Sequence, residues 1–358
     1  MHIKEQLFTF IMPDRNKIND WISSRKKRLE SLKADELYPL IINGDKQALS
    51  SAITLIESQN QQNKKEARAL IEKCTSSRPK SWRIGITGVP GVGKSTFIEA
   101  FGRIVIEAGH KLAVLAIDPS SNVSGGSILG DKTRMDWLSN QENAFIRPTA
   151  AGGNLGGVAR NSRDALVLCE AAGFDVIFIE TVGVGQSETM VHDMVDYFLL
   201  LMLSGAGDEL QGMKRGIMEL ADTLLITKAD SGNEKKSEMA RREYANAVHL
   251  FPEKESQWVT NVITTSSVNG NGLQESWDNI VSYFNQITLN GFYDSNRMNQ
   301  NSRFLKSNLT EFISNEIEGN LKLKQYFENL EKDIKKGTIS VTLAVELLYQ
   351  AYIDSIKK

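Results

Sequence analysis

The sequence predicts an α/β fold in which a doubly wound, mainly parallel β-sheet carries α-helical extensions at both ends. From Trp82 onward, short apolar runs alternate with segments long enough for helices, a pattern typical of a parallel sheet covered on both faces. Before residue 79 and after residue 290, apolar residues recur at helical spacing instead. We therefore expect an N-terminal helical region (1–78), a sheet domain (79–290) and a C-terminal helical arm (291–358).

Each element follows from the spacing of its apolar residues. In the N-terminal region, Leu49, Ile53 and Ile56 share one helical face. The runs expected to form strands are Arg83–Thr87, Leu112–Asp118, Val176–Glu180, Phe198–Leu203, Leu224–Thr227 and Val262–Thr265. The helices expected between them are Ser95–Ala108, Val158–Ala172, Glu209–Asp222, Lys235–His249 and Leu273–Ile287.

The C-terminal arm is expected to hold at least two amphipathic helices. Gly337 is typical of a residue that ends a helix, and Ser340 is typical of the N-cap of the next one. The apolar faces of these two helices consist of Leu323, Phe327, Leu330, Ile334 and of Val341, Val345, Leu348, Tyr352. They can fold back on their own chain or pair with another subunit.

Composition excludes several classes of protein. The 42 Lys and Arg residues nearly balance 44 Asp and Glu residues, which argues against a nucleic-acid partner held by a basic surface. No apolar stretch approaches the ~18–20 residues that a membrane span needs, and the first residues do not resemble a secretory signal. Two cysteines, Cys74 and Cys169, are too few for a disulfide framework. We expect a cytoplasmic protein with no membrane contact.

Glycine is concentrated in the middle of the chain, where 20 of the 27 glycines lie between Gly85 and Gly216. There the expected strand Arg83–Thr87 runs into a sequence that fits G-x-x-x-x-G-K-[ST] and is followed by an expected helix. Such a loop points backbone N–H groups at phosphate oxygens, its lysine reaches the β- and γ-phosphates, and its serine hydroxyl binds Mg²⁺. The predicted phosphate-binding residues are Gly88, Val89, Pro90, Gly91, Val92, Gly93, Lys94, Ser95 and Thr96.

Three acidic residues are candidates for a metal and hydrolysis centre. Asp118 and Glu180 each end an expected strand, and the carboxyl ends of parallel strands meet at one edge of the sheet. Asp131 lies between them in a glycine-rich segment, where it can order a water molecule or contact Mg²⁺. The expected metal-binding residues are therefore Ser95, Asp118, Asp131 and Glu180.

The run Thr227-Lys228-Ala229-Asp230 follows another expected strand and is similar to the [NT]-K-x-D motif that reads guanine. The Asp230 carboxylate can accept hydrogen bonds from guanine N1–H and from its exocyclic amine, which adenine does not offer together. Ser266, Ser267 and Val268 follow the last expected strand, where a second loop contacts the base in such proteins.

Taken together, these motifs resemble the methylmalonyl-CoA mutase-associated GTPases of the MeaB/ArgK type, a family that includes the methylmalonic aciduria type A protein. The resemblance runs from about residue 40 to the C-terminus and does not obviously include the first 35 or so residues. The runs that carry it are Gly88–Thr96, Asp118–Ser121, Gly126–Met135, Glu180–Glu188 and Gly205–Gly212.

The resemblance implies a P-loop GTPase that binds GTP and GDP with Mg²⁺ and uses Lys94, Asp131 and Glu180 in hydrolysis. It implies a homodimer joined through the C-terminal helices, and a role in gating adenosylcobalamin loading onto methylmalonyl-CoA mutase and protecting that enzyme. It also implies a loop that responds to the nucleotide state, with the residues Gly207, Asp208, Glu209, Gln211, Lys214 and Arg215.

Two positions depart from the family pattern. Thr227 stands where the family usually has Asn, and Ser267 where it usually has Ala. An Asn amide ties the base loop to the phosphate loop through both a donor and an acceptor, whereas a Thr hydroxyl keeps only part of that connection. We expect the affinity for nucleotide to fall by ~1 kcal/mol.

Two alternative functions stay open on the sequence alone. One is a nickel-delivery GTPase of the urease or hydrogenase maturation type, although the four histidines are dispersed and no Cys has a nearby His. The other is a nucleotide-switched binding module with negligible turnover, which the Thr227 substitution favours.

Overall fold

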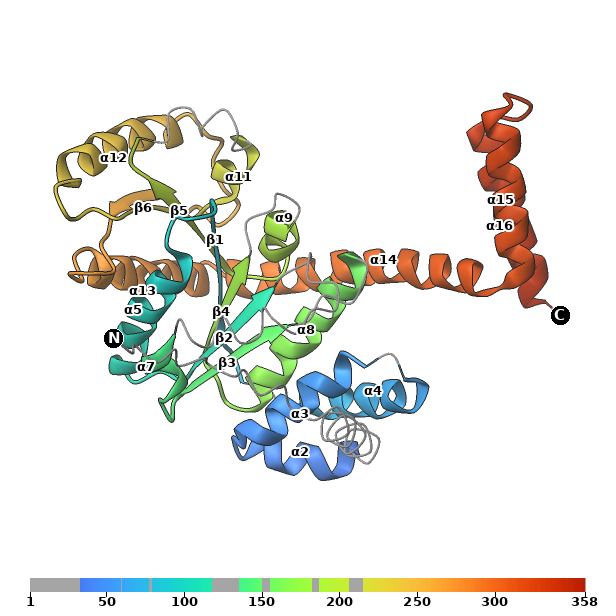
Figure 1. The fold of residues 1–358 in the computed structure, drawn as a ribbon, viewed down its shortest axis with the longest axis horizontal. Helices are drawn as coiled ribbons and strands as arrows, with labels where there is room; N and C mark the ends of the chain where they lie inside the picture. The colour runs from blue at the N-terminus through green and yellow to red at the C-terminus, as the bar shows by residue number, and fades with distance from the viewer. Residues whose placement is uncertain are drawn as a thin grey trace, which may run out of the picture. The chain divides into compact units, whose positions relative to one another are not determined.

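The chain folds around a seven-stranded parallel sheet with helices on both faces and helical extensions at both ends (Figure 1). The computed structural model describes residues 33–58, 60–76, 79–117, 135–149, 155–181, 187–205 and 215–357. Its contacts divide the chain into two compact units, Met1–Tyr293 and Asp294–Lys358. The predicted α/β class is confirmed, and the predicted three-part division stays a prediction.

All strand pairs of the sheet are parallel, so their carboxyl ends meet at one edge. The strand order is β3-β2-β4-β1-β5-β6-β7, which places β1 at the centre, between β4 and β5. The strands are β1 (Trp82–Gly88), β2 (Leu112–Ile117), β3 (Ala144–Thr149), β4 (Val176–Thr181), β5 (Tyr197–Leu203), β6 (Thr223–Thr227) and β7 (Asn261–Thr264).

Strand β3 was not expected from the sequence. It lies at an edge of the sheet and pairs with β2 alone, with Pro148 opposite Ala116. Proline cannot donate a ladder hydrogen bond and is therefore confined to edge positions in sheets. Arg147 and Pro148 also interrupt the apolar pattern by which the other strands are recognised.

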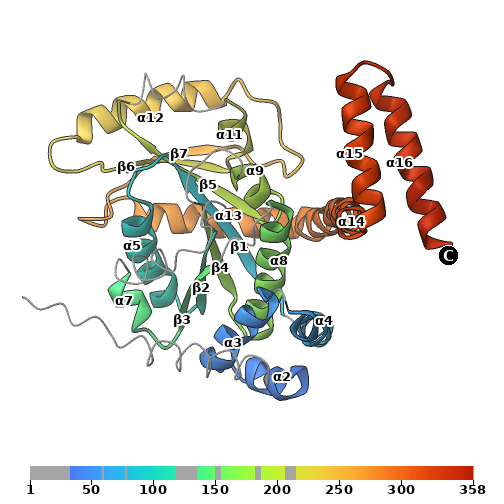
Figure 2. The same ribbon diagram turned by 45° about the vertical axis from the view of Figure 1, so that its right-hand side comes forward.

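Two hydrophobic clusters separate the sheet from its helices, one on each face. One face is covered by α5 (Lys94–Glu107), α7 (Asp136–Ser139) and α13 (Leu273–Leu289), which Figure 2 shows together with the sheet. The other face carries α8 (Leu155–Ala171), α9 (Ser187–His192), α11 (Arg215–Leu220) and α12 (Glu234–Val248). The helix expected over Glu209–Asp222 is thus described only as α11, because residues 206–214 lie outside the described residues.

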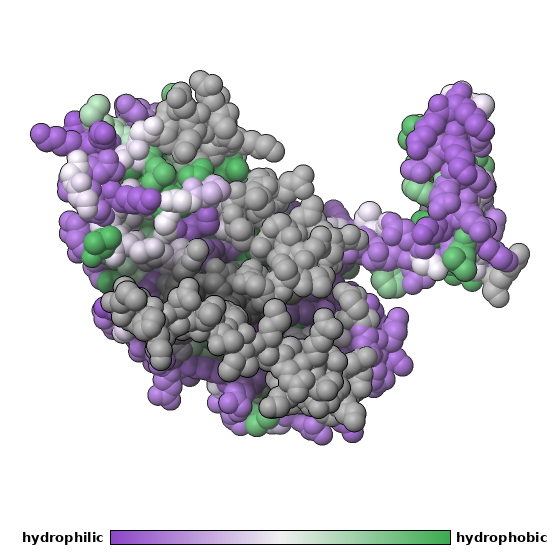
Figure 3. Space-filling view, in the orientation of Figure 1, coloured by the Kyte–Doolittle hydropathy of each residue, from purple (hydrophilic) through white to green (hydrophobic). Residues whose placement is uncertain are grey.

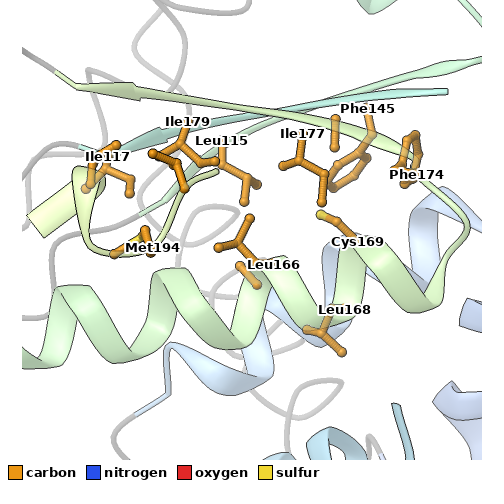
Figure 4. Packing of buried hydrophobic residues seen from close by; sticks show 14 of the residues in the cluster. Leu115, Ile117, Phe145, Leu166, Leu168, Cys169, Phe174, Ile177, Ile179 and Met194 are labelled. Atoms are coloured by element: carbon orange, nitrogen blue, oxygen red, sulfur yellow. The ribbon is translucent and has the colours of Figure 1, made fainter. Parts of the chain in front are cut away.

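Helix α8 is buried on two sides. Leu166 and Cys169 point toward Ile177 and Ile179 of β4, whereas Leu168 points away from the sheet (Figure 4). The three N-terminal helices α2 (Ala34–Ile42), α3 (Lys46–Ile56) and α4 (Gln61–Thr75) contact α8 and share its hydrophobic cluster. The N-terminal region, as far as it is described, therefore forms a further layer over α8.

Aspartates fix the register of the central strands. Asp175, Asp196 and Asp222 each stand directly before a strand, β4, β5 and β6 respectively. Each carboxylate accepts a hydrogen bond from a backbone N–H at the start of the neighbouring strand. The donors are Lys111 N (2.7 Å), Arg83 N (2.9 Å) and Phe198 N (2.8 Å). These bonds hold the amino edge of the sheet, opposite the edge where the predicted site residues lie.

A buried ion pair joins β1 to α8. The Arg83 guanidinium contacts the Glu170 carboxylate at 2.7 Å, and the two side chains are only 6% and 2% exposed. The Ser81 hydroxyl donates to the same carboxylate at 2.6 Å, and the Tyr293 hydroxyl donates to the Ser81 carbonyl oxygen at 2.7 Å. Hydrogen bonds of this kind offset the desolvation of a buried pair.

The C-terminal unit contains most of α14 (Phe292–Gly319) and the helices α15 (Leu321–Lys335) and α16 (Val341–Ile356). The predicted stop and cap are confirmed: Gly337 has φ +72°, and the Ser340 side chain accepts a bond from Leu343 N at 3.1 Å. Leu323 and Leu330 are buried, as expected, but Val341 and Val345 are each 62% exposed. Leu348 and Tyr352 of the same expected face are half-buried, and α16 also buries Ala344, so the apolar face expected from the sequence lies open in the single chain only at Val341 and Val345.

Among the described residues, no helix combines the length and the apolar character that crossing a membrane requires.

Removing the carboxylate of Glu170 tests the buried pair. We expect Glu170→Ala to lower the free energy of unfolding by about 3–5 kcal/mol, because it leaves the Arg83 charge buried without this partner. The double variant Arg83→Met/Glu170→Leu should lose much less. Urea denaturation followed by tryptophan fluorescence measures both. Asp35→Ala, which removes an exposed pair with Lys73, is the matched control and should barely move the midpoint; an equal shift in all three variants contradicts the assignment.

Candidate functional site

The phosphate loop lies where β1 gives way to α5, at the carboxyl edge of the sheet. Gly91 and Gly93 adopt φ values of +78° and +96°, which side chains disfavour, and Gly93 is the residue that caps α5. Because the N-terminus of a helix has free backbone N–H groups, α5 presents donors at this position. The motif therefore has the strand-loop-helix geometry that the sequence predicts.

Lys94 folds back over the loop that precedes it. Its ammonium donates to the Gly88 carbonyl oxygen at 2.7 Å and, at 3.4 Å, to that of Val89. Burial lowers the pKa of Lys94, while the nearby carboxylates of Glu180 and Glu188 act in the opposite direction. The partly desolvated ammonium thus stands among groups that favour its charged form, as phosphate oxygens also would.

Two buried glutamates accompany Lys94. Glu180 lies in β4 opposite Ile86 of β1 and is 7% exposed, and Glu188 lies in the first turn of α9 and is 5% exposed. The residue after Glu180, Thr181, shares a 2.7 Å hydroxyl hydrogen bond with Thr87 of β1. Glu180 was predicted as a site residue, and Glu188 was not, although it ends the E-T-V-G-V-G-Q-S-E run.

The loop after β6 is bonded directly to the phosphate loop. The Thr227 hydroxyl lies 2.9 Å from the Val92 carbonyl oxygen and 3.1 Å from that of Met202 in β5. Lys228, in a left-handed conformation with φ +57°, extends its ammonium to the Gly91 carbonyl oxygen at 2.8 Å. Thr227 thus ties the end of β6 both to the phosphate loop and to β5.

Asp230 and the loop after β7 form a second bonded group. The Ser266 hydroxyl donates to the Asp230 carboxylate and accepts from the backbone N–H groups of Val268 (3.2 Å) and Asn269 (3.3 Å). Ser267 is half-buried, and the Val268 side chain is 81% exposed. The carboxylate is therefore held in place at the sheet edge beside an exposed apolar side chain.

Asn233, which none of the sequence motifs includes, supports the loop after β6. Its side-chain amide donates to the Lys228 carbonyl oxygen at 3.0 Å and to the Ser204 hydroxyl at 2.6 Å. The signal available in the sequence was an Asn two residues before the expected helix Lys235–His249, near the position of an N-cap, although in the structure its side chain makes no cap hydrogen bond to α12. In the structure it fixes the backbone on which Lys228 and Asp230 stand.

Several predicted residues cannot be placed. Asp118 and Asp131 lie outside the described residues, as do Gly207, Asp208, Glu209, Gln211 and Lys214 of the predicted nucleotide-responsive loop. Arg215 is the first residue of α11. The described residues bring together the phosphate loop, Glu180, the Thr227–Asp230 loop and Ser266–Val268 at one edge of the sheet.

The donors near Lys94 suit a hard divalent cation. Ser95 offers a hydroxyl oxygen at the start of α5, and Glu180 offers a carboxylate whose charge acts on Lys94. Oxygen ligands of this kind, together with phosphate oxygens, are those that Mg²⁺ prefers. Within the described ranges, no group of three or more His, Cys, Asp and Glu residues is placed to hold a metal ion.

A parallel sheet with a phosphate loop after its central strand and a T-K-x-D loop bonded to it defines a P-loop GTPase. The family model for "Methylmalonyl Co-A mutase-associated GTPase MeaB" matches residues 49–322. Since this is more than half of the chain, the chain belongs to that family.

Individual relatives agree with this assignment. A "Putative GTPase" of Caulobacter vibrioides is 46% identical over 90% of this chain and 99% of the relative. The mitochondrial methylmalonic aciduria type A homolog of Mus musculus is 40% identical over 89% of this chain and 79% of the relative. A crystal structure described as an LAO/AO transport system kinase superposes with a TM-score of 0.72 at 33% identity, covering 88% of this chain and 96% of that one.

We expect Thr227→Val to bind GDP about fivefold more weakly, because one neutral hydrogen bond contributes about 1 kcal/mol. Isothermal titration measures the change. Thr260→Val is the matched control, since Thr260 also donates its hydroxyl to a carbonyl oxygen (Ala221, 3.0 Å) but stands before β7, at the opposite edge of the sheet. Equal affinities for wild type and Thr227→Val contradict the role given to this hydroxyl.

Proposed function

We propose that this protein binds and hydrolyses GTP with Mg²⁺ and acts as a chaperone of methylmalonyl-CoA mutase, gating adenosylcobalamin loading and protecting the enzyme. The observation that carries the proposal is the direct bonding of the T-K-x-D loop to the phosphate loop, in a chain that belongs to a family associated with this mutase. The mouse relative, named for methylmalonic aciduria, points the same way.

Guanine recognition is assigned to Asp230 and the Ser266–Val268 loop. The Ser266 hydroxyl donates to one oxygen of the Asp230 carboxylate and so holds the carboxylate in one orientation at the sheet edge. In this orientation the carboxylate would accept hydrogen bonds from guanine N1–H and from the exocyclic amine. A site organised around such acceptors disfavours adenine strongly, since adenine would leave the second oxygen of the half-buried Asp230 carboxylate without a donor from the base. The exposed Val268 side chain is available to cover a bound base.

Phosphate binding and hydrolysis are assigned to Lys94, Ser95, Glu180 and the backbone of residues 88–96. A bound Mg²⁺ neutralises charge that develops on the transferred phosphoryl group. Lys94 would exchange its bonds to the Gly88 and Val89 carbonyl oxygens for phosphate oxygens. Glu180, at the end of β4, would orient the attacking water, with Asp118 and Asp131 as further oxygen donors.

The coupling to the mutase is assigned to the nucleotide-responsive loop. Its last residue, Arg215, opens α11, and α11 packs with α9, the helix that carries Glu188. Glu188 is buried and its charge reaches Lys94, so we assign α11 and α9 as the link between the loop and the lysine to which phosphate binding is assigned. This connection gives the mutase partner a route by which to sense GTP or GDP.

We further propose a homodimer formed through the C-terminal helices. In Figure 3 the visible face of the α15–α16 hairpin is mostly hydrophilic, with apolar residues along its margins, and Tyr349 of α16 is 62% exposed, as are Val341 and Val345. Burying such a surface in a second copy is favourable by about 25 cal/mol per Å² of apolar area. Sedimentation at micromolar concentration should give a dimer for the wild type and a monomer for Val341→Asp/Val345→Asp, and a wild-type monomer contradicts this part.

A cytoplasmic location completes the proposal. Both cysteines, Cys74 and Cys169, are free and buried, as suits a reducing compartment.

Turnover and partner binding test the function in sequence. GTP hydrolysis with Mg²⁺ should be abolished by Lys94→Ala and unchanged by Lys111→Ala, a control at an exposed lysine before β2. The protein should then copurify with a cobalamin-dependent methylmalonyl-CoA mutase, with affinity that differs between GTP, GDP and no nucleotide in the wild type but not in Lys94→Ala.

Three other results would contradict the proposal, and two of them would favour an alternative function. Nucleotide-dependent mutase binding without turnover favours the switched binding module. Stoichiometric nickel binding without mutase binding favours a nickel-delivery GTPase. Retained turnover in Lys94→Ala refutes the phosphate assignment.

A further inference from the structure

The sequence contains four Asn–Gly steps, at residues 43–44, 269–270, 271–272 and 290–291. In such a step the glycine nitrogen can attack the Asn side-chain amide, because glycine has no Cβ to hinder the approach. A bond forms between this nitrogen and Cγ, the Cγ–Nδ2 bond breaks, and ammonia leaves with the proton of the glycine N–H. Water then opens the succinimide ring to give aspartate or isoaspartate. The hydrogen bonds of each step decide how readily it reacts.

Three of the four steps are held by a hydrogen bond of the glycine N–H. The bonds run from Gly44 N to the Ile41 carbonyl oxygen (2.8 Å), from Gly270 N to that of Ser266 (3.0 Å) and from Gly291 N to that of Thr288 (3.4 Å). Asn269 Oδ1 also accepts from Asn271 N at 3.0 Å. The Asn290 amide donates to the Ser256 carbonyl oxygen at 3.0 Å. Such bonds have to break before the nitrogen attacks, and each neutral one slows the reaction about fivefold.

The step at Asn271 and Gly272 differs from the other three. The Asn271 side chain is exposed, and Gly272 has φ +74°. Within the described ranges of the chain, neither the Asn271 side-chain amide nor the Gly272 N–H has a hydrogen-bond partner. The two groups that react are therefore adjacent in the sequence and uncommitted, so this step has no hydrogen bond to break.

The backbone of Asn271 supports the loop to which guanine recognition is assigned. Its carbonyl oxygen accepts from Ser266 N at 2.9 Å and from the Thr265 hydroxyl at 3.1 Å. Ser266 in turn donates its hydroxyl to the Asp230 carboxylate. Two successive hydrogen bonds thus connect the reactive residue to the carboxylate that is assigned to the base.

An isoaspartate at position 271 would break this connection. The chain then runs through the former side chain, so the backbone gains one carbon and the former main-chain carbonyl group becomes a free carboxylate. Gly272 already lies so close to the end of β7 that a Cβ would overlap the Thr264 carbonyl oxygen, which leaves the longer backbone no space on that side. The loop has to shift, and Ser266 shifts with it. Aspartate, the other product, keeps the backbone and adds only an exposed charge.

We propose that Asn271 is a site of spontaneous deamidation whose isoaspartyl product releases the guanine-reading loop as the protein ages. The modification needs only Asn271, the Gly272 nitrogen and water. Its effect on nucleotide binding rests on the proposed function. Because the ammonia diffuses away, a modified chain keeps its weakened site.

Tandem mass spectrometry of peptides from the full-length chain, incubated in mildly alkaline buffer, tests the site. Asn271 should deamidate about fivefold or more faster than Asn269, which has to lose at least one hydrogen bond. Asn43 and Asn290 should also react more slowly. Methyl transfer by a protein-isoaspartate methyltransferase measures the isoaspartate, and it should drop in Asn271→Gln, whose longer side chain closes the ring slowly. Equal rates at the four Asn residues overturn the assignment.

Nucleotide binding tests the consequence. The deamidated chain, separated by anion exchange and mainly isoaspartyl, should bind GDP about fivefold or more weakly, the effect expected when one supporting hydrogen bond is lost. Asn271→Asp is the matched control, since it carries the new charge on an unchanged backbone, and it should bind GDP within about twofold of wild type. A deamidated chain that binds GDP as tightly as wild type overturns the effect on the site.

The outcomes separate this inference from the proposed function. A wild type that binds no GDP defeats the proposed function and leaves the result of the peptide mapping intact. Amide hydrogen exchange at Ser266, whose N–H loses its acceptor, then decides the effect on the loop. It should be about fivefold or more faster in the deamidated chain but not in Asn271→Asp. Unchanged exchange at Ser266 overturns the release of the loop.

Discussion

At Gly88, the last residue of β1, the backbone passes so close to β5 that a side chain would not fit. A Cβ there would lie 2.6 Å from the Leu201 carbonyl oxygen and 2.9 Å from the Leu201 Cβ in β5. Because the chain turns at this close approach, Lys94 folds back onto the Gly88 carbonyl oxygen and α5 starts at a fixed place. The same turn presents the carbonyl oxygens of Gly91 and Val92 to the loop after β6. The relative position of the two loops therefore depends on one contact between neighbouring strands.

That contact requires a rigid frame, which the opposite edge of the sheet supplies. Asp196 binds the start of β1 to β5, and Asp222 binds β5 to β6, so the register of these three strands is fixed before they reach the site. The buried Arg83–Glu170 pair then fastens β1 to α8. Burial alone does not define register in strands that are apolar on both faces, since a slipped strand would bury equally apolar residues. Hydrogen bonds to charged groups distinguish the correct alignment.

The sequence predicted what depends on local pattern. Six of the seven strands, the long helices α5, α8, α12 and α13, and the Gly337 and Ser340 boundary of the C-terminal hairpin follow from apolar spacing and from residues with special backbone roles. The short helices α7 and α9 were not predicted. Strand β3 was missed because Pro148 and an arginine break its pattern, and that arginine, Arg147, binds Glu57, the C-cap residue of α3, at 2.9 Å. The partly open face of α16 shows a different limit: periodicity identifies an apolar face but not what covers it.

Some of the contacts that the sequence could not reveal share one physical cause: the partner is a main-chain atom. Thr227 bonds to the carbonyl oxygen of Val92, 135 residues away, and Asn233 bonds to the carbonyl oxygen of Lys228. Every residue except proline offers the same two backbone groups, so these bonds place no demand on the partner's side chain and leave no pattern there. A motif marks the residues that meet the ligand, whereas the residues that hold a motif in place bind backbone and are found only in the fold. The substitution of Thr for Asn at 227 is intelligible for this reason, since a hydroxyl that reaches a carbonyl oxygen replaces part of an amide without any change at Val92.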